Sequence, residues 1–191
     1  MGDNNYSSCT NDTVTFTISK LDATGITVTA DDITYGQYAN ITVNVPDGIE
    51  GTITLKLNDT ANSEITLPIF NGKVNWIVYN LSAGNYTVNV TYNGNNVYYS
   101  YNESKEFEVK KATPKIEFFI ESTTREQADI GIKFNYTFDG TVYINGPDKD
   151  YGIVNIQDGV YSFKTDGTLD YTKYTITVEF AGNENLTGVT K

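Results

Sequence analysis

Apolar and polar residues alternate in short runs along most of the chain. Alternation with a period of two is typical of β-strands that bury one face, and the segments between these runs are rich in Gly, Asn, Asp and Pro. Seven such runs occur in residues 23–111: Ile26–Ala30, Ile41–Val45, Ile53–Leu57, Ile65–Ile69, Val74–Val78, Tyr86–Tyr92 and Phe107–Val109. Short strands separated by turn residues predict an all-β fold, and specifically an immunoglobulin-like β-sandwich.

The same pattern occurs twice. Residues 51–55 (GTITL) match residues 140–144 (GTVYI) at an offset of 89. Residues 86–95 (YTVNVTYNGN) match residues 174–183 (YTITVEFAGN) at an offset of 88. A repeat of about 90 residues is the size of one small sandwich domain. We therefore expect two tandem immunoglobulin-like domains of about seven strands each.

The expected boundaries leave residues 1–22 as a leader, followed by domains at residues 23–111 and 112–191. Within the leader, residues 11–20 (NDTVTFTISK) match residues 102–111 (NESKEFEVKK), which include the final strand of the first domain. The leader is therefore predicted to carry the final strand of a preceding repeat. By the same alignment, the second domain is predicted to be truncated before its own last strand. The two domains are expected to join near Lys111–Lys115 with limited contact, because this linker is short and polar.

The leader strand has an alternation of its own, with Val14, Phe16 and Ile18 on one face. A strand without a domain and a domain without its last strand can satisfy each other's backbone groups. We therefore expect head-to-tail donation of Val14–Lys20 to the second domain of another molecule. The alternative is that this segment folds onto the first domain as an extra first strand.

Each repeat has a tyrosine five residues after a leucine, near the start of its sixth strand. These tyrosines are Tyr86, after Leu81, and Tyr174, after Leu169. The spacing is similar to that of the tyrosine corner, in which the phenol hydroxyl bonds to backbone a few residues upstream. We expect both tyrosines to be structural. The alternative is that they are strand tyrosines that simply face the core.

Other aromatic residues are assigned by their phase along the strands. Trp76 alternates in phase with its apolar neighbours, and Phe163 is its equivalent in the second domain, so both rings are predicted to face the core. Tyr98, Tyr99 and Tyr101 lie between the sixth and seventh strands of the first domain, where partial exposure is expected. These three tyrosines are the candidates for a ligand-binding site.

Charge and composition exclude several classes of function. The net charge of −11 repels nucleic acids and anionic lipids, and no cluster of Lys or Arg interrupts it. No apolar run has the length needed to cross a membrane. The absence of histidine removes Ser-His-Asp and Cys-His catalysis and zinc sites built on imidazole. We expect no enzymatic activity, no cofactor, no nucleic-acid partner and no direct membrane insertion. Cys9 is the single cysteine, so it cannot form an intramolecular disulfide.

Acidic residues offer the remaining candidate chemistry. The closest pairs are Asp31 with Asp32 and Asp148 with Asp150, all in predicted turns. Acidic residues are common turn formers, which favours a structural role over the acid–base catalysis of glycosidases. Residues 148–152 (DKDYG) also offer two carboxylates to a hard cation, but the segment lacks the further ligands of a calcium loop. We expect no metal site, with Asp148 and Asp150 as the only candidates.

Asparagines in the pattern N-x-S/T are unusually frequent. Ten of the 21 asparagines have it, more than the abundance of Ser and Thr alone predicts. This excess fits an exported and glycosylated surface, but Thr-rich strands with Asn in their turns also generate such triplets. The ten are Asn5, Asn11, Asn40, Asn58, Asn80, Asn85, Asn89, Asn102, Asn135 and Asn185.

Several motifs together resemble a known family. They are YGQ (35–37), GTITL (51–55), FNGK (70–73), LSAGNYTVNVTYNGN (81–95) and FEVKKATP (107–114). In combination they are similar to the bacterial Ig-like repeat found in adhesin-like surface proteins of methanogenic archaea. The second domain departs from this pattern, with REQ at residues 125–127 and LDYTKY at residues 169–174.

The resemblance implies a non-enzymatic, extracellular stalk or adhesive module in a long array on a cell surface. Its implied partners are neighbouring repeats and either a surface protein or a glycan receptor. An alternative function of a different class is a carbohydrate-binding module that uses Tyr98, Tyr99 and Tyr101. The motifs of the family fix turns and corners, so they specify the fold and leave the ligand open.

Overall fold

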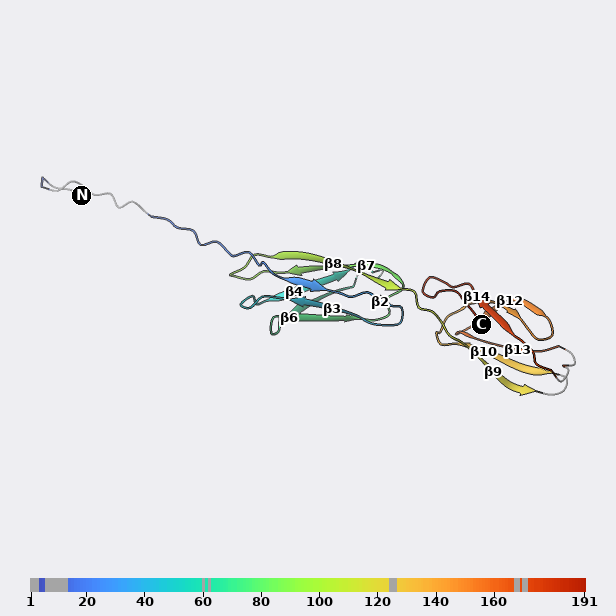
Figure 1. Ribbon diagram of the computed structural model, residues 1–191. Coiled ribbons are helices and arrows are strands. Elements are labelled where there is room, and N and C mark those ends of the chain that lie inside the picture. Colours follow the sequence, from blue (N-terminus) through green and yellow to red (C-terminus); the bar gives the residue numbers. More distant parts are fainter. Residues whose placement is uncertain are drawn as a thin grey trace.

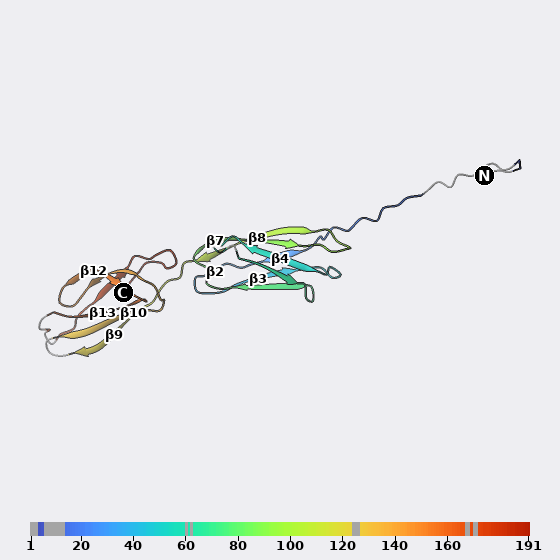
Figure 2. The ribbon, with the colours of Figure 1, turned by 180° about the vertical axis from the view of Figure 1, so that it is seen from behind.

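The computed structural model of the chain describes residues 4–5, 14–59, 61, 63–123, 127–166, 169 and 172–191. They form two β-sandwiches placed end to end, and residues 14–20 extend from the first sandwich on the side away from the second (Figure 1). The view from behind shows the same elongated arrangement (Figure 2). The described residues form strands and no helix. They therefore include no helix long and apolar enough to cross a membrane. The predicted all-β fold is confirmed.

The first sandwich packs a three-stranded sheet against a five-stranded sheet. Its strands are β1 (Thr27–Thr29), β2 (Ile33–Thr34), β3 (Ala39–Asn44), β4 (Thr52–Leu57), β5 (Glu64–Pro68), β6 (Lys73–Val78), β7 (Gly84–Tyr92) and β8 (Tyr101–Lys110). The sheets have the orders β1-β3-β6 and β2-β8-β7-β4-β5. All neighbouring strands are antiparallel except β2 and β8, which are parallel.

The second sandwich repeats this arrangement. Its strands are β9 (Ile116–Thr123), β10 (Ala128–Phe134), β11 (Gly140–Asn145), β12 (Asp150–Ile156), β13 (Val160–Lys164), β14 (Thr177–Phe180) and β15 (Val189–Thr190). The sheets have the orders β13-β10-β9 and β12-β11-β14-β15. Each strand of the first sandwich except β2 therefore has a counterpart at the same place in the second.

Both sandwiches have an immunoglobulin-like strand order. The two-residue β2 is left out of the count here, so that each sandwich has seven strands. The first, second and fifth of these seven form one sheet, and the third, sixth and seventh lie in the other. In the constant type of immunoglobulin domain the fourth strand pairs within the first of these sheets. Here the fourth strand pairs with the third instead, as β5 does with β4 and β12 does with β11.

The seven strands predicted for the first sandwich are all found, and two details differ. β8 begins at Tyr101, six residues before the predicted start at Phe107. Its first half is polar and exposed on most positions, so it lacks the apolar alternation on which the prediction relied. β2 was missed, because two residues are too few to show a period; Ile33 pairs there with Val109.

The prediction that the second sandwich lacks its last strand was wrong in one respect. β15 pairs with β14 and places Val189 opposite Phe180. This is the point at which β8 starts beside β7, where Tyr101 lies opposite Tyr92. The seventh strand of the second sandwich is therefore present in its first two residues.

Each sandwich has its own hydrophobic core. Trp76 lies opposite Ile41 and packs, partly buried, against the first core. Phe163 has the same place in the second sandwich, opposite Ile130, and is 8% exposed. Both rings therefore lie on the core side of their sheets. Tyr35 packs against both cores and is the described hydrophobic residue common to the two clusters.

Candidate functional site

The linker between the sandwiches is docked onto the turn between β14 and β15. The Ala112 backbone N–H donates to the Asn185 carbonyl at 3.0 Å, and the Thr187 N–H donates to the Ala112 carbonyl at 2.8 Å. The Lys111 ammonium donates to the Asn183 carbonyl at 2.6 Å. Ala112 thereby forms a parallel bridge with the turn. These bonds fix the direction in which the chain enters the second sandwich.

Two further contacts join the sandwiches directly. The Ala83 backbone N–H donates to Asn185 Oδ1 at 2.8 Å. The rings of Tyr35 and Tyr136 lie with their centroids 6.0 Å apart and tilted by 32°. The described contacts at the junction include directional hydrogen bonds, and the limited contact expected from the sequence stays a prediction. Because Tyr35 and Ala83 come from different loops of the first sandwich, together they restrain rotation about the linker.

The same docking occurs at the start of the first sandwich. The Leu21 backbone N–H donates to the Val97 carbonyl at 2.8 Å, and the Tyr99 N–H donates to the Leu21 carbonyl at 2.9 Å. The Lys20 ammonium donates to the Asn95 carbonyl at 2.6 Å. Lys20 and Leu21 thus make the same hydrogen bonds with the first sandwich that Lys111 and Ala112 make with the second.

An asparagine builds each of the two receiving turns. Asn95 Oδ1 accepts hydrogen bonds from the backbone N–H groups two and three residues later, at 2.7 and 2.8 Å. Asn183 Oδ1 accepts the equivalent bonds at 2.9 and 2.8 Å. Such Asx turns close a loop with the side chain of the asparagine and leave its carbonyl available. The docking lysine binds that carbonyl in both sandwiches.

The two docking positions differ in exposure. Ala112 and Leu186, at the junction, are each 2% exposed. At the first sandwich the equivalent pair is Leu21, which is 56% exposed, and Tyr98, which is half-buried against the first core. Leu21 is therefore exposed where its counterpart Ala112 is covered.

The structure does not gather the three candidate tyrosines on one surface. Tyr98 and Tyr101 pack, half-buried, against the first core, and the Tyr101 hydroxyl donates to Glu103 Oε2 at 2.9 Å. Tyr99 is 50% exposed. Since neighbouring residues in an extended segment point to opposite sides, Tyr98 and Tyr99 do not form a shared platform.

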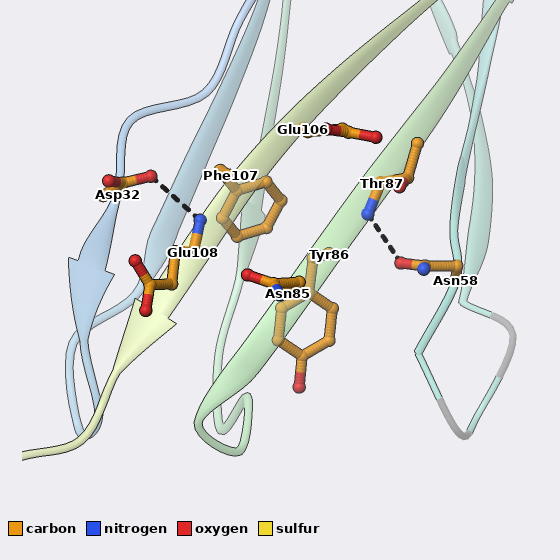
Figure 3. A pocket seen from close by; sticks show the side chains of 8 residues that line it. All are labelled: Asp32, Asn58, Asn85, Tyr86, Thr87, Glu106, Phe107 and Glu108. Carbon is orange, nitrogen blue, oxygen red and sulfur yellow. Dashed lines mark hydrogen bonds between the residues drawn. The ribbon is translucent and has the colours of Figure 1, made fainter.

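A shallow hollow lies over β7 and β8, near the end of β8 that leads to the linker (Figure 3). The rings of Tyr86 and Phe107 stack there with centroids 5.6 Å apart. The Tyr86 hydroxyl donates to the Ser82 carbonyl at 3.0 Å, which is the contact a tyrosine corner makes. The hollow is lined by Asp32, Asn58, Asn85, Tyr86, Thr87, Glu106, Phe107 and Glu108.

Asp32 has a structural role in this hollow. Its Oδ1 accepts a hydrogen bond from the Glu108 backbone N–H at 2.9 Å, and its Oδ2 lies 3.4 Å from the Lys110 ammonium. These contacts, the backbone bond first, hold the pKa of the Asp32 carboxyl below its ordinary value. Asp32 therefore stays ionised and ties the segment before β2 to β8.

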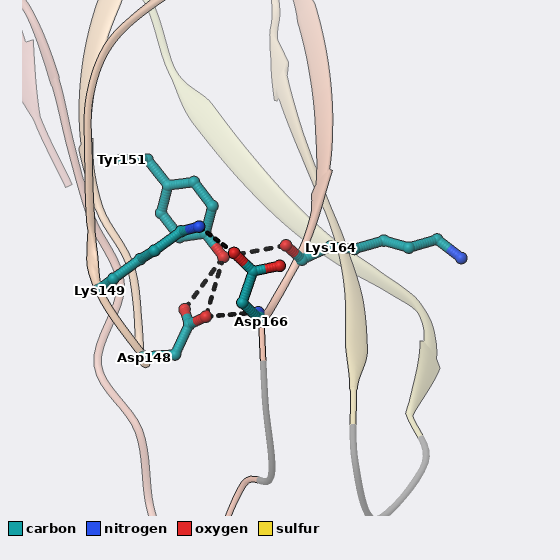
Figure 4. Close-up of polar contacts among 5 residues, drawn as sticks. All are labelled: Asp148, Lys149, Tyr151, Lys164 and Asp166. Atoms are coloured by element: carbon teal, nitrogen blue, oxygen red, sulfur yellow. Dashed lines mark hydrogen bonds and ion pairs between the residues drawn. The ribbon is translucent and has the colours of Figure 1, made fainter.

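Asp148 accepts hydrogen bonds from Tyr151, close to it in the chain, and from Asp166, the second residue after β13 (Figure 4). The Tyr151 hydroxyl lies 3.0 Å from Asp148 Oδ1, and the Asp166 backbone N–H donates to Asp148 Oδ2 at 2.5 Å. The Lys149 ammonium binds the Asp166 carboxylate. Burial and, second, the Asp148 carboxylate raise the pKa of the Tyr151 phenol above its ordinary value. These contacts among Asp148, Lys149, Tyr151 and Asp166 hold the loop at Asp148 against the end of β13.

Asp150 has partners of its own. Its Oδ2 accepts a hydrogen bond from the Tyr143 hydroxyl at 2.6 Å, and its Oδ1 accepts one from the Gly152 backbone N–H at 2.7 Å. The bond from Tyr143, followed by that from Gly152, lowers the pKa of the Asp150 carboxyl. Among the residues that the structure describes, no three His, Cys, Asp or Glu side chains converge on a point where a metal ion could sit.

Tyr174 is the equivalent of Tyr86 by alignment, and its expected structural role stays a prediction. It lies three residues before β14 and is 36% exposed, whereas Tyr86 is inside β7. Some features singled out in the sequence lie outside the described residues, namely Cys9, the triplet at Asn11, Arg125 and Glu126 of the REQ motif, and Asp170 and Tyr171 of the LDYTKY motif.

Sequence reasoning missed the docking turns, although its own alignment contained their signal. Asn95 and Asn183 are the last residues of the matched segments 86–95 and 174–183. Each ends a GN pair whose asparagine closes the Asx turn. The alignment showed that these asparagines recur. Only the structure showed that their carbonyls accept hydrogen bonds from the lysines of the docking segments.

No family model and no curated protein matches the chain. Solved structures with a similar course include a segment of two fibronectin type-III domains from chicken tenascin, at 11% identity and a TM-score of 0.48, covering 86% of this chain and 95% of that one. The BSP domain of a biofilm associated protein matches at 19% identity and a TM-score of 0.31, over 85% of this chain and 28% of that one. Beta-glucuronidase 3 of Bacteroides uniformis matches at 10% identity and a TM-score of 0.30, over 88% of this chain and 25% of that one. These TM-scores are below 0.5, and the immunoglobulin-like character of the two sandwiches rests on their own strand order.

Proposed function

We propose that this chain is a non-enzymatic spacer in an extracellular cell-surface protein, where tandem immunoglobulin-like repeats hold another part of the molecule away from the cell. The observation that carries the proposal is the repeated docking of Lys20–Leu21 and Lys111–Ala112 on successive sandwiches. A linker docked in the same way at each repeat fixes the angle between neighbours. Repeats joined by such linkers add length along one direction.

The chemistry of the described surface supports a passive role. The candidate carboxylates Asp32, Asp148 and Asp150 each accept hydrogen bonds from protein donors. The net charge of −11 keeps a long array soluble and discourages association with anionic surfaces. The frequent N-x-S/T triplets and the resemblance to adhesin-like repeats of methanogenic archaea extend the proposal to an adhesive array. Its partners are then neighbouring repeats and a surface protein or glycan receptor.

Labelling of intact cells that produce the protein tests its location. Antibodies raised against the chain are expected to bind unpermeabilised cells, and external protease is expected to remove the signal. Binding that appears only after permeabilisation would contradict an extracellular spacer.

Binding to immobilised glycans tests the carbohydrate-binding alternative. A spacer is expected to give no specific signal. A signal lost in Tyr99→Ala, which removes the exposed ring of the three, would instead support a carbohydrate-binding module. Tyr79→Ala is the matched control, since Tyr79 is also exposed, at 64%, and lies elsewhere on the same sandwich.

A further inference from the structure

We propose that the parallel pairing of β2 with β8 is a mechanical clamp, which keeps the first sandwich folded while the protein is stretched. The clamp consists of residues 32–35 on one side and residues 108–110 on the other. The proposal rests on the spacer role and deepens it, because a spacer that connects a cell to something outside it carries tension along the chain. It states which contacts of the first sandwich resist that tension.

The path of the chain determines how tension reaches the clamp. The chain enters the first sandwich at Leu21, which is hydrogen-bonded to Val97 and Tyr99, just before β8 begins. It leaves at Lys111, directly after β8 ends. β8 therefore runs from the end where the chain enters to the end where it leaves (Figure 1). Because β2 is parallel to β8, it points in the same direction.

Tension along the chain shears the clamp. The segment that leads into β2 is pulled toward the entry end, and β8 is pulled toward the exit end. Parallel strands pulled in this way slide along each other, so their hydrogen bonds are strained together. Strands that are pulled apart at one end separate instead one bond at a time. The rate of forced unfolding depends on the unfolding barrier, and simultaneous loss of several bonds raises that barrier more than their loss in sequence.

The backbone bonds of the clamp continue past the two paired residues. Ile33 pairs with Val109, and Thr34 pairs with Lys110. The Tyr35 backbone N–H then donates to the Lys110 carbonyl at 2.8 Å. Val109 is 1% exposed and Ile33 packs against the first core, so apolar side chains shield one side of these bonds from water. A hydrogen bond in such surroundings is electrostatically stronger than one in water.

Asp32 adds side-chain contacts at the other end of the clamp. Its Oδ1 accepts a hydrogen bond from the Glu108 backbone N–H at 2.9 Å (Figure 3). Its Oδ2 lies 3.4 Å from the Lys110 ammonium. One carboxylate thus contacts two residues of β8, and hydrogen bonds to a charged acceptor are stronger than those between neutral groups. Sliding of β2 along β8 breaks both contacts.

The pairing of β1 with β3 does not have the same effect, although tension reaches it first. β1 pairs with β3 at the edge of the three-stranded sheet. β3 is neither the strand by which the chain enters nor the one by which it leaves. If β1 detaches, the entering chain is still joined to β8 through β2. The clamp therefore determines whether the two ends of the sandwich separate.

Pulling single molecules in two directions tests the clamp. Attachment through the exposed positions Ser19→Cys and Lys115→Cys, in the full chain with Cys9→Ser, pulls the sandwich from its two ends and shears the clamp. Attachment through Tyr38→Cys, just after the turn that follows β2, and Lys115→Cys pulls near the exit end alone, so that β2 peels from β8. The unfolding force is expected to be at least about twofold higher in the first direction, because several bonds then break together. Equal forces in the two directions would overturn the proposal.

Variants at Asp32 separate a mechanical role from ordinary stabilisation. Asp32→Ala removes both side-chain contacts and should raise the unfolding rate at constant force by at least about threefold when the clamp is sheared. When β2 is peeled from the exit end, the contacts of Asp32 break last, and a change of less than about 1.5-fold is expected. Asp31→Ala, at the exposed neighbouring residue outside the clamp, is the matched control and should leave both rates unchanged. Equal acceleration in the two directions, or by the two variants, would overturn the proposal.

The pulling experiment is independent of the labelling of intact cells that tests the spacer role. Equal unfolding forces in the two directions would overturn the clamp and leave the spacer role standing. Labelling that appears only after permeabilisation would contradict the spacer role, whatever force the first sandwich resists.

Discussion

The two sandwiches differ most in their sixth and seventh strands. β7 has nine residues and pairs with the ten-residue β8, whereas β14 has four residues and β15 has two. The sequences of the two sixth strands match closely, with YTVNVTY at residues 86–92 and YTITVEF at residues 174–180. The two sixth-strand sequences have the same apolar pattern, but the two strands differ in length. The partner strand therefore sets the length of the sixth strand. Intrinsic β-propensity does not decide it here.

The largest expected effect comes from giving the second sandwich a full last strand. Appending seven residues that copy Ser104–Lys110 after Lys191 should extend β14 to residue 172. Burial of the added Phe and Val should raise the free energy of unfolding of this sandwich by about 3–6 kcal/mol, at about 1.5–3 kcal/mol for each side chain. Hydrogen exchange at residues 172–180 measures the change. The same extension with Ser at both apolar positions is the control, and an equal gain from it would mean that packing is not the cause.

Removing the equivalent side chain from the first sandwich should have a slightly smaller effect. Phe107→Ala is expected to lower the free energy of unfolding of the first sandwich by about 3–5 kcal/mol, because it leaves a cavity beside Tyr86. Phe16→Ala changes the aligned residue but removes an exposed ring, so a change within about 0.5 kcal/mol is expected in the monomer. Denaturant unfolding followed by the fluorescence of Trp76, the single tryptophan, reports on this sandwich. Similar losses in both variants would show that the leader packs on the first sandwich.

The two docking turns allow a smaller comparison. Asn185→Ala removes the bond to the Ala83 N–H, a loss of about 1 kcal/mol at the junction. If cleavage requires local opening of the linker, a lysine-directed protease should then cut at Lys111 and Lys115 about fivefold faster. Val97→Ala changes the equivalent position in the first sandwich and should leave this rate unchanged. Unaltered cleavage in Asn185→Ala would mean that the hydrogen bond does not hold the junction.

The smallest effect is expected at the corner of the first sandwich. Tyr86→Phe removes the hydrogen bond to the Ser82 carbonyl while keeping the stacked ring, and should destabilise the first sandwich by about 1 kcal/mol. Tyr79→Phe, at a residue that is 64% exposed, should change it by less than about 0.5 kcal/mol. Thermal unfolding of both variants decides this point, and equal shifts would show that Tyr86 does not pin the corner.

Alternation and internal repetition predict most of this fold. Buried pairs such as Ile41 with Val43 and Ile130 with Ile132 have the period of a strand, so their faces can be read directly. The exceptions are two-residue β2 and the polar half of β8, where hydrogen bonding to a neighbour replaces side-chain burial as the cause of strand formation. Such long-range pairing leaves no local pattern in the sequence.

The junction was less predictable than the fold. The alignment contained Lys20 with Lys111 and Asn95 with Asn183, but a lysine beside a strand end is normally solvated and gives no reason to expect a bond to a carbonyl. Asn185 was noted as part of an N-x-S/T triplet, and its role as acceptor for Ala83 depends on a residue 102 positions away. Contacts of this kind require the three-dimensional placement of both sandwiches.

A distance measurement between the sandwiches tests the central claim, that docked linkers hold successive repeats at a fixed angle. Spin labels at Lys73→Cys in β6 and Asn155→Cys in β12, in a Cys9→Ser background, would lie on exposed positions of different sandwiches. Pulsed electron resonance is expected to give one narrow distribution, similar in width to that of a pair placed within the first sandwich at Lys73→Cys and Lys105→Cys. Adding Asn185→Ala should broaden the distribution. A broad or multiple distribution in the otherwise unaltered protein would contradict the claim and describe two sandwiches on a flexible tether.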